Sequence, residues 1–293
     1  MVEMKIKAIA PWFGAKRNLA PVIVELIGKH KVYWEIFCGS MAVLLGKPPC
    51  GMETVNDLNG DLVNLARVIQ DKKLSLKLYE KLSRTLYSSK LWEESKERWT
   101  DHCYDDGEVS VDRAYDFFVA SWMGRNGVSG TKRCNYQFVL RWCMGGGQGA
   151  TRWGNVVRSM PAWHKRLQNV VIVQHDAFYL LENIKDEKGT VIYADPPYFV
   201  KSSKYVHDFE AADHVRLAEM LGRFKKTKVI VSYYDDPRLE QLYPGWARPH
   251  VGTTRQPLRN ATKSKKSPAP SKSSKQQEVL LVNRMEPVGL FGN

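Results

Sequence analysis

The sequence lacks any apolar run long enough to cross a membrane, and it does not begin with a basic segment followed by an apolar one. We therefore expect neither a transmembrane helix nor a secretory signal, and we predict a cytoplasmic protein. Cysteine is scarce, with five residues and no pair at CxxC spacing. Because disulfide frameworks and structural zinc sites need paired cysteines, we expect free thiols in a reducing compartment.

Histidines in a ligand pattern are missing, and acidic residues are outnumbered. The seven histidines are scattered without an HExxH pattern, so we expect no metal. The 44 lysines and arginines exceed the 31 aspartates and glutamates, which gives a formal net charge of +13. This excess indicates a polyanionic partner, and it favours nucleic acid over an acidic membrane surface.

The most informative segment is residues 190–199. Residues 190–194 are apolar and β-branched, which predicts a buried strand, and the two prolines of Asp195-Pro196-Pro197-Tyr198 must end it. In open α/β sheets ligands bind beyond the carboxyl ends of the strands. There the Asp195 carboxylate and the Pro196 carbonyl could accept the two protons of an exocyclic amine, while Tyr198 stacks on the base. The alternative is a proline-rich turn in which Asp195 caps backbone N–H groups.

Two earlier strand ends predict a nucleotide-type site. Residues 32–37 predict a strand, Gly39 a tight turn, and Ser40 the N-cap of a helix over residues 41–45. Residues 52–57 predict a strand that ends at Asp57, close to the offset from Gly39 at which an acid binds ribose hydroxyls. The GxGxxG and GxxxxGK[ST] patterns are missing. A ligand with a ribose but no pyrophosphate, such as S-adenosylmethionine, fits this pattern, whereas the alternative is an ordinary turn and helix cap.

A loop and an insertion carry aromatic and cationic residues. The loop over residues 11–16 is either a lid on the core or a cofactor contact. Residues 67–169 predict an inserted domain with helices over 74–99 and 111–123. Its glycine-rich loops, 124–133 and 145–149, suit contact with phosphates and unstacked bases, although a solvated insertion is the alternative. These loops are interleaved with Arg141, Trp142, Arg152, Trp153 and Arg158.

The last part of the chain returns to alternating strands and helices. We predict strands over 170–174, 228–232 and 278–283, a helix over 211–224, and a loop over 233–237. Asp176 and Phe178 follow the first of these strands and suit either an adenine ring or a turn beside the core. The segment over residues 252–277 is basic and rich in serine, so we expect a flexible loop that could add salt-sensitive affinity for nucleic acid.

These segments follow one another in the order WFGAK, EIFCGS, NDLNGDL, a variable insertion, QHDAF and ADPPYF. In residues and in order, the sequence resembles the Dam-like (alpha) group of N6-adenine DNA methyltransferases. VIVSYYDDPRLEQLYPGW and EVLLVNR are similar to the carboxyl-terminal part of that family. The resemblance implies a Rossmann-like α/β domain, residues 1–66 and 170–293, that binds S-adenosylmethionine, with a mostly helical target-recognition insertion over residues 67–169. It also implies methyl transfer to adenine N6 of a base flipped out of double-stranded DNA.

The resemblance assigns roles to individual residues. The catalytic residues would be Asp195, Pro196, Pro197 and Tyr198. The cofactor-binding residues would be Trp12, Lys16, Phe37, Gly39, Ser40, Asp57, Asp176, Phe178 and Asp195. The candidate DNA-binding residues are Arg125, Asn126, Lys132, Arg133, Arg141, Arg152, Lys263, Lys265 and Lys266.

Two positions depart from the family pattern. Met41 stands where the glycine turn usually has a second glycine, and Arg125 stands where an aromatic residue usually precedes Asn-Gly. No target sequence, GATC included, is therefore carried over. Two other functions stay open. An N4-cytosine or RNA-adenine methyltransferase would use the same acceptor pair, and a non-catalytic relative would bind nucleic acid through its basic charge alone.

Overall fold

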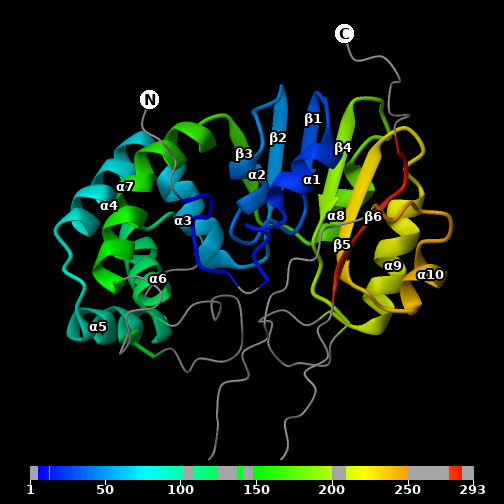
Figure 1. Cartoon of the computed structure of the whole chain (residues 1–293). Helices are drawn as coiled ribbons and strands as arrows, with labels where there is room; N and C mark the ends of the chain where they lie inside the picture. The colour runs from blue at the N-terminus through cyan, green and yellow to red at the C-terminus, as the bar shows by residue number, and fades with distance from the viewer. Residues whose placement is uncertain are drawn as a thin grey trace, which may run out of the picture.

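The computed structural model describes residues 6–12, 14–101, 108–124, 137–140, 148–199, 209–249 and 277–285. Within these ranges six strands form one sheet (Figure 1). The strands are β1 (Val32–Glu35), β2 (Met52–Asn56), β3 (Val170–Val173), β4 (Thr190–Ala194), β5 (Lys228–Tyr234) and β6 (Glu278–Val282). Their order is β3-β2-β1-β4-β5-β6. Among these six strands, β5 and β6 pair antiparallel, and the other four neighbouring pairs are parallel.

The direction in which the chain builds this sheet reverses next to β1. From β1 the chain adds β2 and β3 on one side, and it then returns to place β4 and β5 on the other side. In doubly wound sheets the crevice for a ligand opens at such a reversal, beyond the carboxyl ends of the strands. The predicted Rossmann-like α/β fold is confirmed, and the reversal places the ligand crevice between β1 and β4.

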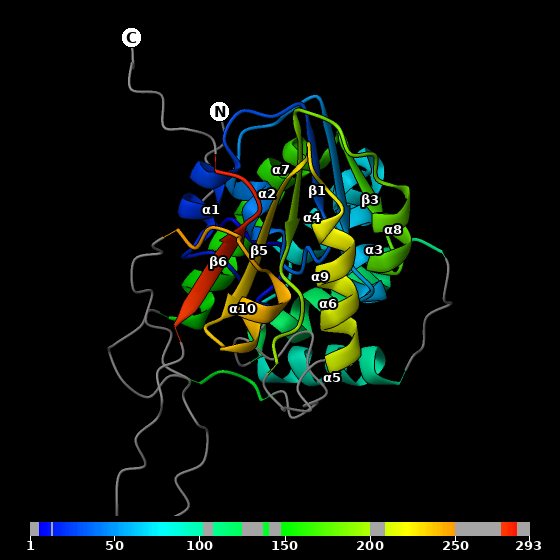
Figure 2. The ribbon, with the colours of Figure 1, turned by 90° about the vertical axis from the view of Figure 1, so that its right-hand side faces the viewer.

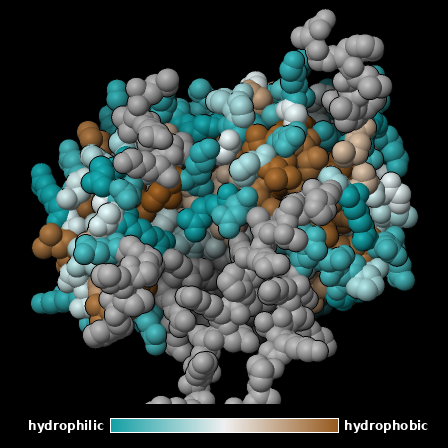
Figure 3. Space-filling view, in the orientation of Figure 1, coloured by the Kyte–Doolittle hydropathy of each residue, from teal (hydrophilic) through white to brown (hydrophobic). Residues whose placement is uncertain are grey.

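Helices cover both faces of the sheet (Figure 2). On one face lie α1 (Ala20–Ile27), α2 (Ala42–Gly46) and α3 (Gly60–Gln70), and on the other lie α8 (Ala177–Asn183), α9 (Ala211–Gly222) and α10 (Arg238–Leu242). Successive side chains of a strand point to opposite faces, so β4 contributes to both cores. Val191 and Tyr193 pack into the first core, and Ile192 and Ala194 pack into the second. In Figure 3 hydrophobic residues gather over α1, which is only partly buried.

A bundle of helices extends the first core beyond the β3 edge of the sheet (Figure 1). It consists of α3 together with α4 (Lys72–Ser83), α5 (Ser89–Thr100), α6 (Val111–Met123) and α7 (Gly149–Leu167). Phe117, Phe118 and Trp163 are fully buried inside it. The bounds of α6 are those predicted, and Ser110 caps its first turn by accepting a hydrogen bond from the Arg113 amide.

The single helix predicted over residues 74–99 is wrong, because the chain breaks between α4 and α5. Thr85 lies in this break and is held by tertiary contacts. Its carbonyl accepts a hydrogen bond from the Trp153 indole at 3.0 Å, and its hydroxyl lies 2.9 Å from the Tyr115 hydroxyl. These partners come from α7 and α6, so the helical periodicity of the segment could not reveal them.

The interpretation of Arg152, Trp153 and Arg158 as loop residues is also wrong, because all three belong to α7. Glycine and proline within this segment disfavour a helix locally. Tertiary packing overrides that preference, since Trp153 and Trp163 are buried in the core. Trp153 is therefore a core residue and not an exposed stacking platform.

Smaller corrections concern the ends of elements. The N-cap of α2 is Met41 and not Ser40, and the helix begins one residue later than predicted. Tyr233 and Tyr234, predicted in a loop, belong to β5, because pairing with β6 extends that strand. The helix α10 was not predicted. Over the described ranges, every helix is too short or too polar to cross a membrane.

Candidate functional site

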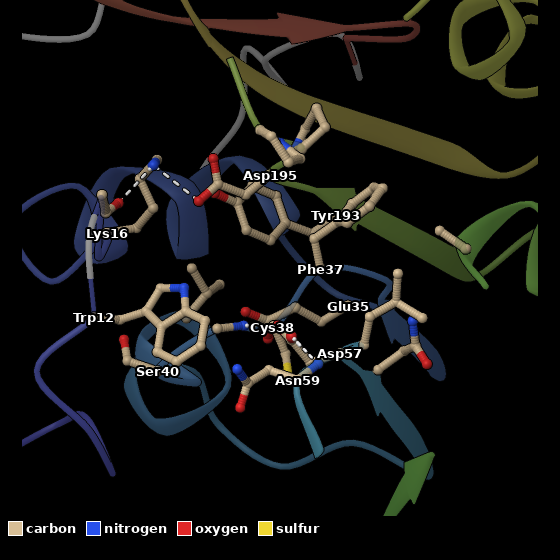
Figure 4. A pocket seen from close by; sticks show the side chains of 18 of the residues that line it. Trp12, Lys16, Glu35, Phe37, Cys38, Ser40, Asp57, Asn59, Tyr193 and Asp195 are labelled. Carbon is tan, nitrogen blue, oxygen red and sulfur yellow. Dashed lines mark hydrogen bonds and ion pairs between the residues drawn. The ribbon is translucent and has the colours of Figure 1, made fainter. Parts of the chain in front are cut away.

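A cavity opens beyond the carboxyl ends of β1, β2 and β4 (Figure 4). Asp195 and Lys16 lie at one end of it, and Ser40, Asp57 and Asn59 lie at the other. The cavity coincides with the reversal in strand order, where a ligand is expected. All but one of the sequence-predicted catalytic and cofactor-binding residues line it, namely Trp12, Lys16, Phe37, Gly39, Ser40, Asp57, Asp176, Phe178, Asp195, Pro196 and Pro197. The exception is Tyr198.

The turn at Gly39 shapes the floor of the cavity. The Gly39 amide donates to Asp57 Oδ2 at 2.8 Å, and the Asn59 amide donates to Asp57 Oδ1 at 2.9 Å. Gly39 has φ +44°, and a Cβ atom there would lie 2.8 Å from Cδ1 of Trp12. Two separate constraints therefore require glycine at this position: the positive φ of the backbone and the close approach of the Trp12 indole.

Met41 keeps the backbone shape that a second glycine would have. Its φ of 59° and ψ of 30° lie in the left-handed region, and it is the one non-glycine residue with positive φ among those described. Its side chain is fully buried in the first core. The left-handed conformation costs about 1–2 kcal/mol in an L-residue, which burial of the thioether side chain offsets.

An acid that the sequence reasoning missed lies at the base of the cavity. Glu35 is 2% exposed and accepts a hydrogen bond from the Tyr33 hydroxyl at 3.0 Å. Burial, which outweighs that hydrogen bond, raises the pKa of Glu35 to about 8. The signal was present in the sequence, because Glu35 opens the EIFCGS segment on the strand that leads into the Gly39 turn.

The Asp195 carboxylate is the centre of a network of side chains. Its Oδ2 lies 2.8 Å from Lys16 Nζ. Its Oδ1 accepts hydrogen bonds from Ser232 Oγ at 2.7 Å and from the Tyr198 hydroxyl at 3.1 Å. Within the described residues, the partners of the Asp195 carboxylate are side chains. The alternative interpretation, in which this carboxylate caps backbone N–H groups of a turn, is therefore wrong.

Lys16 connects Asp195 with a second carboxylate. Its ammonium donates to the Gly14 carbonyl at 2.8 Å and lies 3.6 Å from Glu278 Oε1. Burial acts to lower the pKa of Lys16, but the Asp195 and Glu278 carboxylates outweigh burial and leave that pKa raised. Lys16, predicted to contact the cofactor, lines the cavity, and its ammonium is engaged by the Asp195 carboxylate.

Tyr198 is packed against other aromatic rings and is not part of the cavity wall. It is 7% exposed, and its ring lies edge-on to Tyr234 with centroids 4.4 Å apart. The Lys16 ammonium lies 5.0 Å from the centroid of the Tyr198 ring. In this arrangement the Tyr198 hydroxyl points to Asp195, and stacking of the ring on a base requires a rearrangement.

Three phenylalanine rings, of Phe37, Phe178 and Phe209, form an aromatic part of the cavity wall. The Phe178 ring stacks on Phe209 with centroids 6.1 Å apart, and Phe37 lies edge-on to Phe209 at 5.9 Å. Asp176 Oδ1 accepts a hydrogen bond from the Phe178 amide at 2.7 Å and so caps α8. Phe209 was missed because no motif covers the stretch of sequence between Tyr198 and Phe209. The three rings together offer an apolar slot for a flat heterocycle.

Of the predicted DNA-binding residues, only Arg152 lies within the described ranges. Its guanidinium lies over the Trp122 ring, 5.0 Å from the centroid. Arg125, Asn126, Lys132, Arg133, Arg141, Lys263, Lys265 and Lys266 lie outside the described residues. Among described residues, no group of three or more His, Cys, Asp or Glu side chains could hold a metal ion.

The reversal in strand order, the glycine turn held by Asp57, and the acid at the end of β4 define a Rossmann-like α/β protein with a site for a nucleoside-type ligand. Residues 12–256 match the profile of the D12 class N6 adenine-specific DNA methyltransferase family. The chain belongs to this family, and the resemblance drawn from its motifs is confirmed.

The individual proteins that the chain resembles match it over a short segment or at low sequence identity. The type II methyltransferase M2.LlaDCHI of Lactococcus lactis subsp. cremoris is 41% identical over 51 residues, which are 17% of this chain and 18% of that protein. The crystal structure of SMU.472 complexed with SAH has 13% identity and a TM-score of 0.36, over 93% of this chain and 53% of that one. The chain thus spans less than a fifth of the curated relative and about half of the structural one.

Proposed function

We propose that the protein transfers a methyl group from S-adenosylmethionine to N6 of an adenine in double-stranded DNA, with the target base flipped out of the helix. Family membership supports the reaction, and one observation carries its location. The Asp195 carboxylate, at the carboxyl end of β4, borders the same cavity as the Gly39 turn and Asp57. An acceptor for an amine and a site for a nucleoside thus share one space.

The residues present fit S-adenosylmethionine. Asp57 lies where an acid binds ribose hydroxyls, and the Phe37, Phe178 and Phe209 rings provide a slot for the adenine. The room left by the missing Cβ of Gly39 is filled by the Trp12 indole, which thereby lies on the wall of the cavity beside the turn. When bound, the cofactor supplies an electrophilic methyl group on a sulfonium.

Asp195 would hold the amine of the target base. A carboxylate offers about four acceptor positions, and three donors, from Lys16, Ser232 and Tyr198, occupy three of them. One position is left for an N6 proton, and the Pro196 carbonyl, which follows directly, would accept the other. Holding both protons directs the nitrogen lone pair away from the ring and toward the methyl group. Positioning in a site that excludes water would supply most of the rate acceleration.

The DNA must be opened to reach this site. Flipping a base out costs roughly a few kcal/mol. We propose that residues 67–169, which include α4, α5, α6 and α7, form the target-recognition insertion on a catalytic domain of residues 1–66 and 170–293. The net charge of +13 supports phosphate contacts, which would make DNA affinity fall steeply with salt.

The test is methyl transfer by Asp195→Ala and Asp195→Asn with duplex DNA and labelled S-adenosylmethionine. We expect the rate to fall at least about a hundredfold, the loss typical when one polar group that stabilises a transition state is removed. Asp235→Ala is the matched control, because Asp235 follows the neighbouring strand β5 but is 59% exposed in a surface ion pair. A near wild-type rate for both Asp195 variants would remove that carboxylate from the reaction.

The modified nucleoside identifies the reaction. Digestion of the product and mass analysis should give N6-methyladenine. N4-methylcytosine, or methylation of RNA only, would assign the same site to a different substrate. A wild-type chain that binds no S-adenosylmethionine by calorimetry would refute the proposed function altogether.

A further inference from the structure

A second buried carboxylate lies behind Asp195. Glu278 is the first residue of β6, and its side chain is 7% exposed. Its Oε1 lies 3.6 Å from Lys16 Nζ, and the same ammonium lies 2.8 Å from Asp195 Oδ2. Glu278 does not line the cavity, so it can act on a ligand there only through the electric field of its charge and not by contact. We call Asp195, Lys16 and Glu278 the charge cluster.

The charge cluster holds one more acid than base. An ammonium with one carboxylate would form a neutral pair, which is the less costly arrangement for buried charges. With Glu278 ionised the cluster has a net charge of −1, and burial, which Lys16 only partly offsets, raises the pKa of the Glu278 carboxyl. Over the described part of the chain, Lys16 is the one cation that pairs with Glu278. The other close neighbours of Glu278 are the phenols of Tyr198, whose single proton Glu278 shares with Asp195, and of Tyr234, its partner in the β5–β6 register.

An unbalanced negative charge beside a cavity favours a ligand with a positive charge. S-adenosylmethionine has one at sulfur, and its demethylated product, S-adenosylhomocysteine, has none there. The two molecules are otherwise nearly the same shape. We propose that Glu278, without contacting the cofactor, gives the charge cluster the net charge that makes the site prefer the methyl donor to the spent product. This inference rests on the proposed function.

The preference would have a use in turnover. Once the methyl group has left, the attraction of the cluster for the cofactor weakens, so the product leaves and a new donor enters. Glu278 would also keep Lys16 charged beside Asp195, because two carboxylates outweigh the burial of its ammonium. Neither effect needs Glu278 to touch the cofactor or the base.

The test is the ratio of the dissociation constants of S-adenosylhomocysteine and S-adenosylmethionine, measured by calorimetry on the full chain near pH 7.5. We expect Glu278→Gln to lower this ratio at least about threefold, because loss of one unit charge weakens the attraction for the sulfonium and hardly changes binding of the product, which has no charge at sulfur. Glu278→Asp keeps the charge and should keep the ratio within about twofold of the wild type.

A double variant separates charge from structure. Lys16→Gln raises the net negative charge of the cluster, and Lys16→Gln with Glu278→Gln restores it to −1. The ratio should therefore fall from the first variant to the second by about the factor that separates the wild type from Glu278→Gln, and the second should lie near the wild type. This comparison removes the same carboxylate, so it tests the proposal even if Glu278→Gln alone does not fold.

Glu53→Gln is the matched control for damage to a buried ion pair. Glu53 is 3% exposed and pairs with Arg166 and Lys47 at the start of β2, away from the cavity. It should lower thermal stability and leave the ratio unchanged. Equal loss of affinity for both ligands in Glu278→Gln, with an unchanged ratio, would overturn the proposal. A wild-type chain that binds neither ligand would instead refute the proposed function.

Discussion

Replacement of Gly39 by alanine is the sharpest test of the cofactor site. Gly39 has a positive φ and carries the Trp12 indole directly against its Cα. Gly245 provides the matched control, because it also has a positive φ, +75°, but a Cβ there would meet nothing within 4 Å. Alanine at Gly245 therefore adds backbone strain alone, whereas alanine at Gly39 adds strain and a collision.

The expected magnitudes follow from these two differences. A left-handed conformation costs an L-residue about 1–2 kcal/mol, so Gly245→Ala should lower the free energy of unfolding by that amount. In Gly39→Ala the new Cβ would lie 2.8 Å from Cδ1 and 2.9 Å from Nε1 of Trp12, distances at which the ring must move. Forced repacking of this kind costs typically about 1–3 kcal/mol more.

Urea denaturation and calorimetry check both expectations. Gly39→Ala should be less stable than Gly245→Ala by about 1–3 kcal/mol, and its affinity for S-adenosylmethionine should fall about tenfold or more because Trp12 and Gly39 both line the cavity. Gly245→Ala should bind the cofactor like the wild type. Gly39→Ala with the stability of Gly245→Ala and an unchanged affinity would show that the reasoning about the turn is wrong.

Two further predictions concern buried charge. Because burial raises the pKa of Glu35 to about 8, the folded chain keeps a proton that the unfolded chain loses near pH 4.5. The stability that the protonated Glu35 contributes is complete below pH 4.5 and is lost as the pH rises through about 8, by about 1.4 kcal/mol per pH unit. The melting temperature of Glu35→Gln should therefore fall less steeply with rising pH than that of the wild type over this range. An equal slope for both proteins would refute this. Glu53→Met should cost about 3–5 kcal/mol in urea denaturation, because it leaves the buried Lys47 and Arg166 cations without the carboxylate that they share, and a cost below about 1 kcal/mol would contradict it.

The elements that carry the motifs could be predicted from the sequence because local chemistry decides them. Proline cannot continue a ladder, so the end of β4 at Asp195 is certain from its composition. Apolar spacing and the Ser110 cap give α6 its predicted bounds. The strand, glycine turn and acid at Asp57 belong together because parallel strands bring their carboxyl ends to one edge.

The helix α7 and the break before α5 could not be predicted in this way. The glycines and the proline of α7 disfavour a helix, and the helix forms because its tryptophans are buried against α3, α4 and α6. There is no room for a Cβ at Gly149, where the Tyr87 ring lies against the backbone. Such contacts join residues far apart in the chain, and periodicity within a segment does not report them.

The sequence by itself determined that a carboxylate, a carbonyl and an aromatic ring follow the end of a buried strand, and that an acid and a glycine turn accompany them. Only the tertiary structure decided what surrounds that carboxylate. Lys16, Ser232 and Glu278 come from three separate segments: Lys16 and Ser232 contact Asp195, and Glu278 reaches Lys16 because β6 runs antiparallel beside β5. Charges so distant in sequence interact only once folding has removed the water between them.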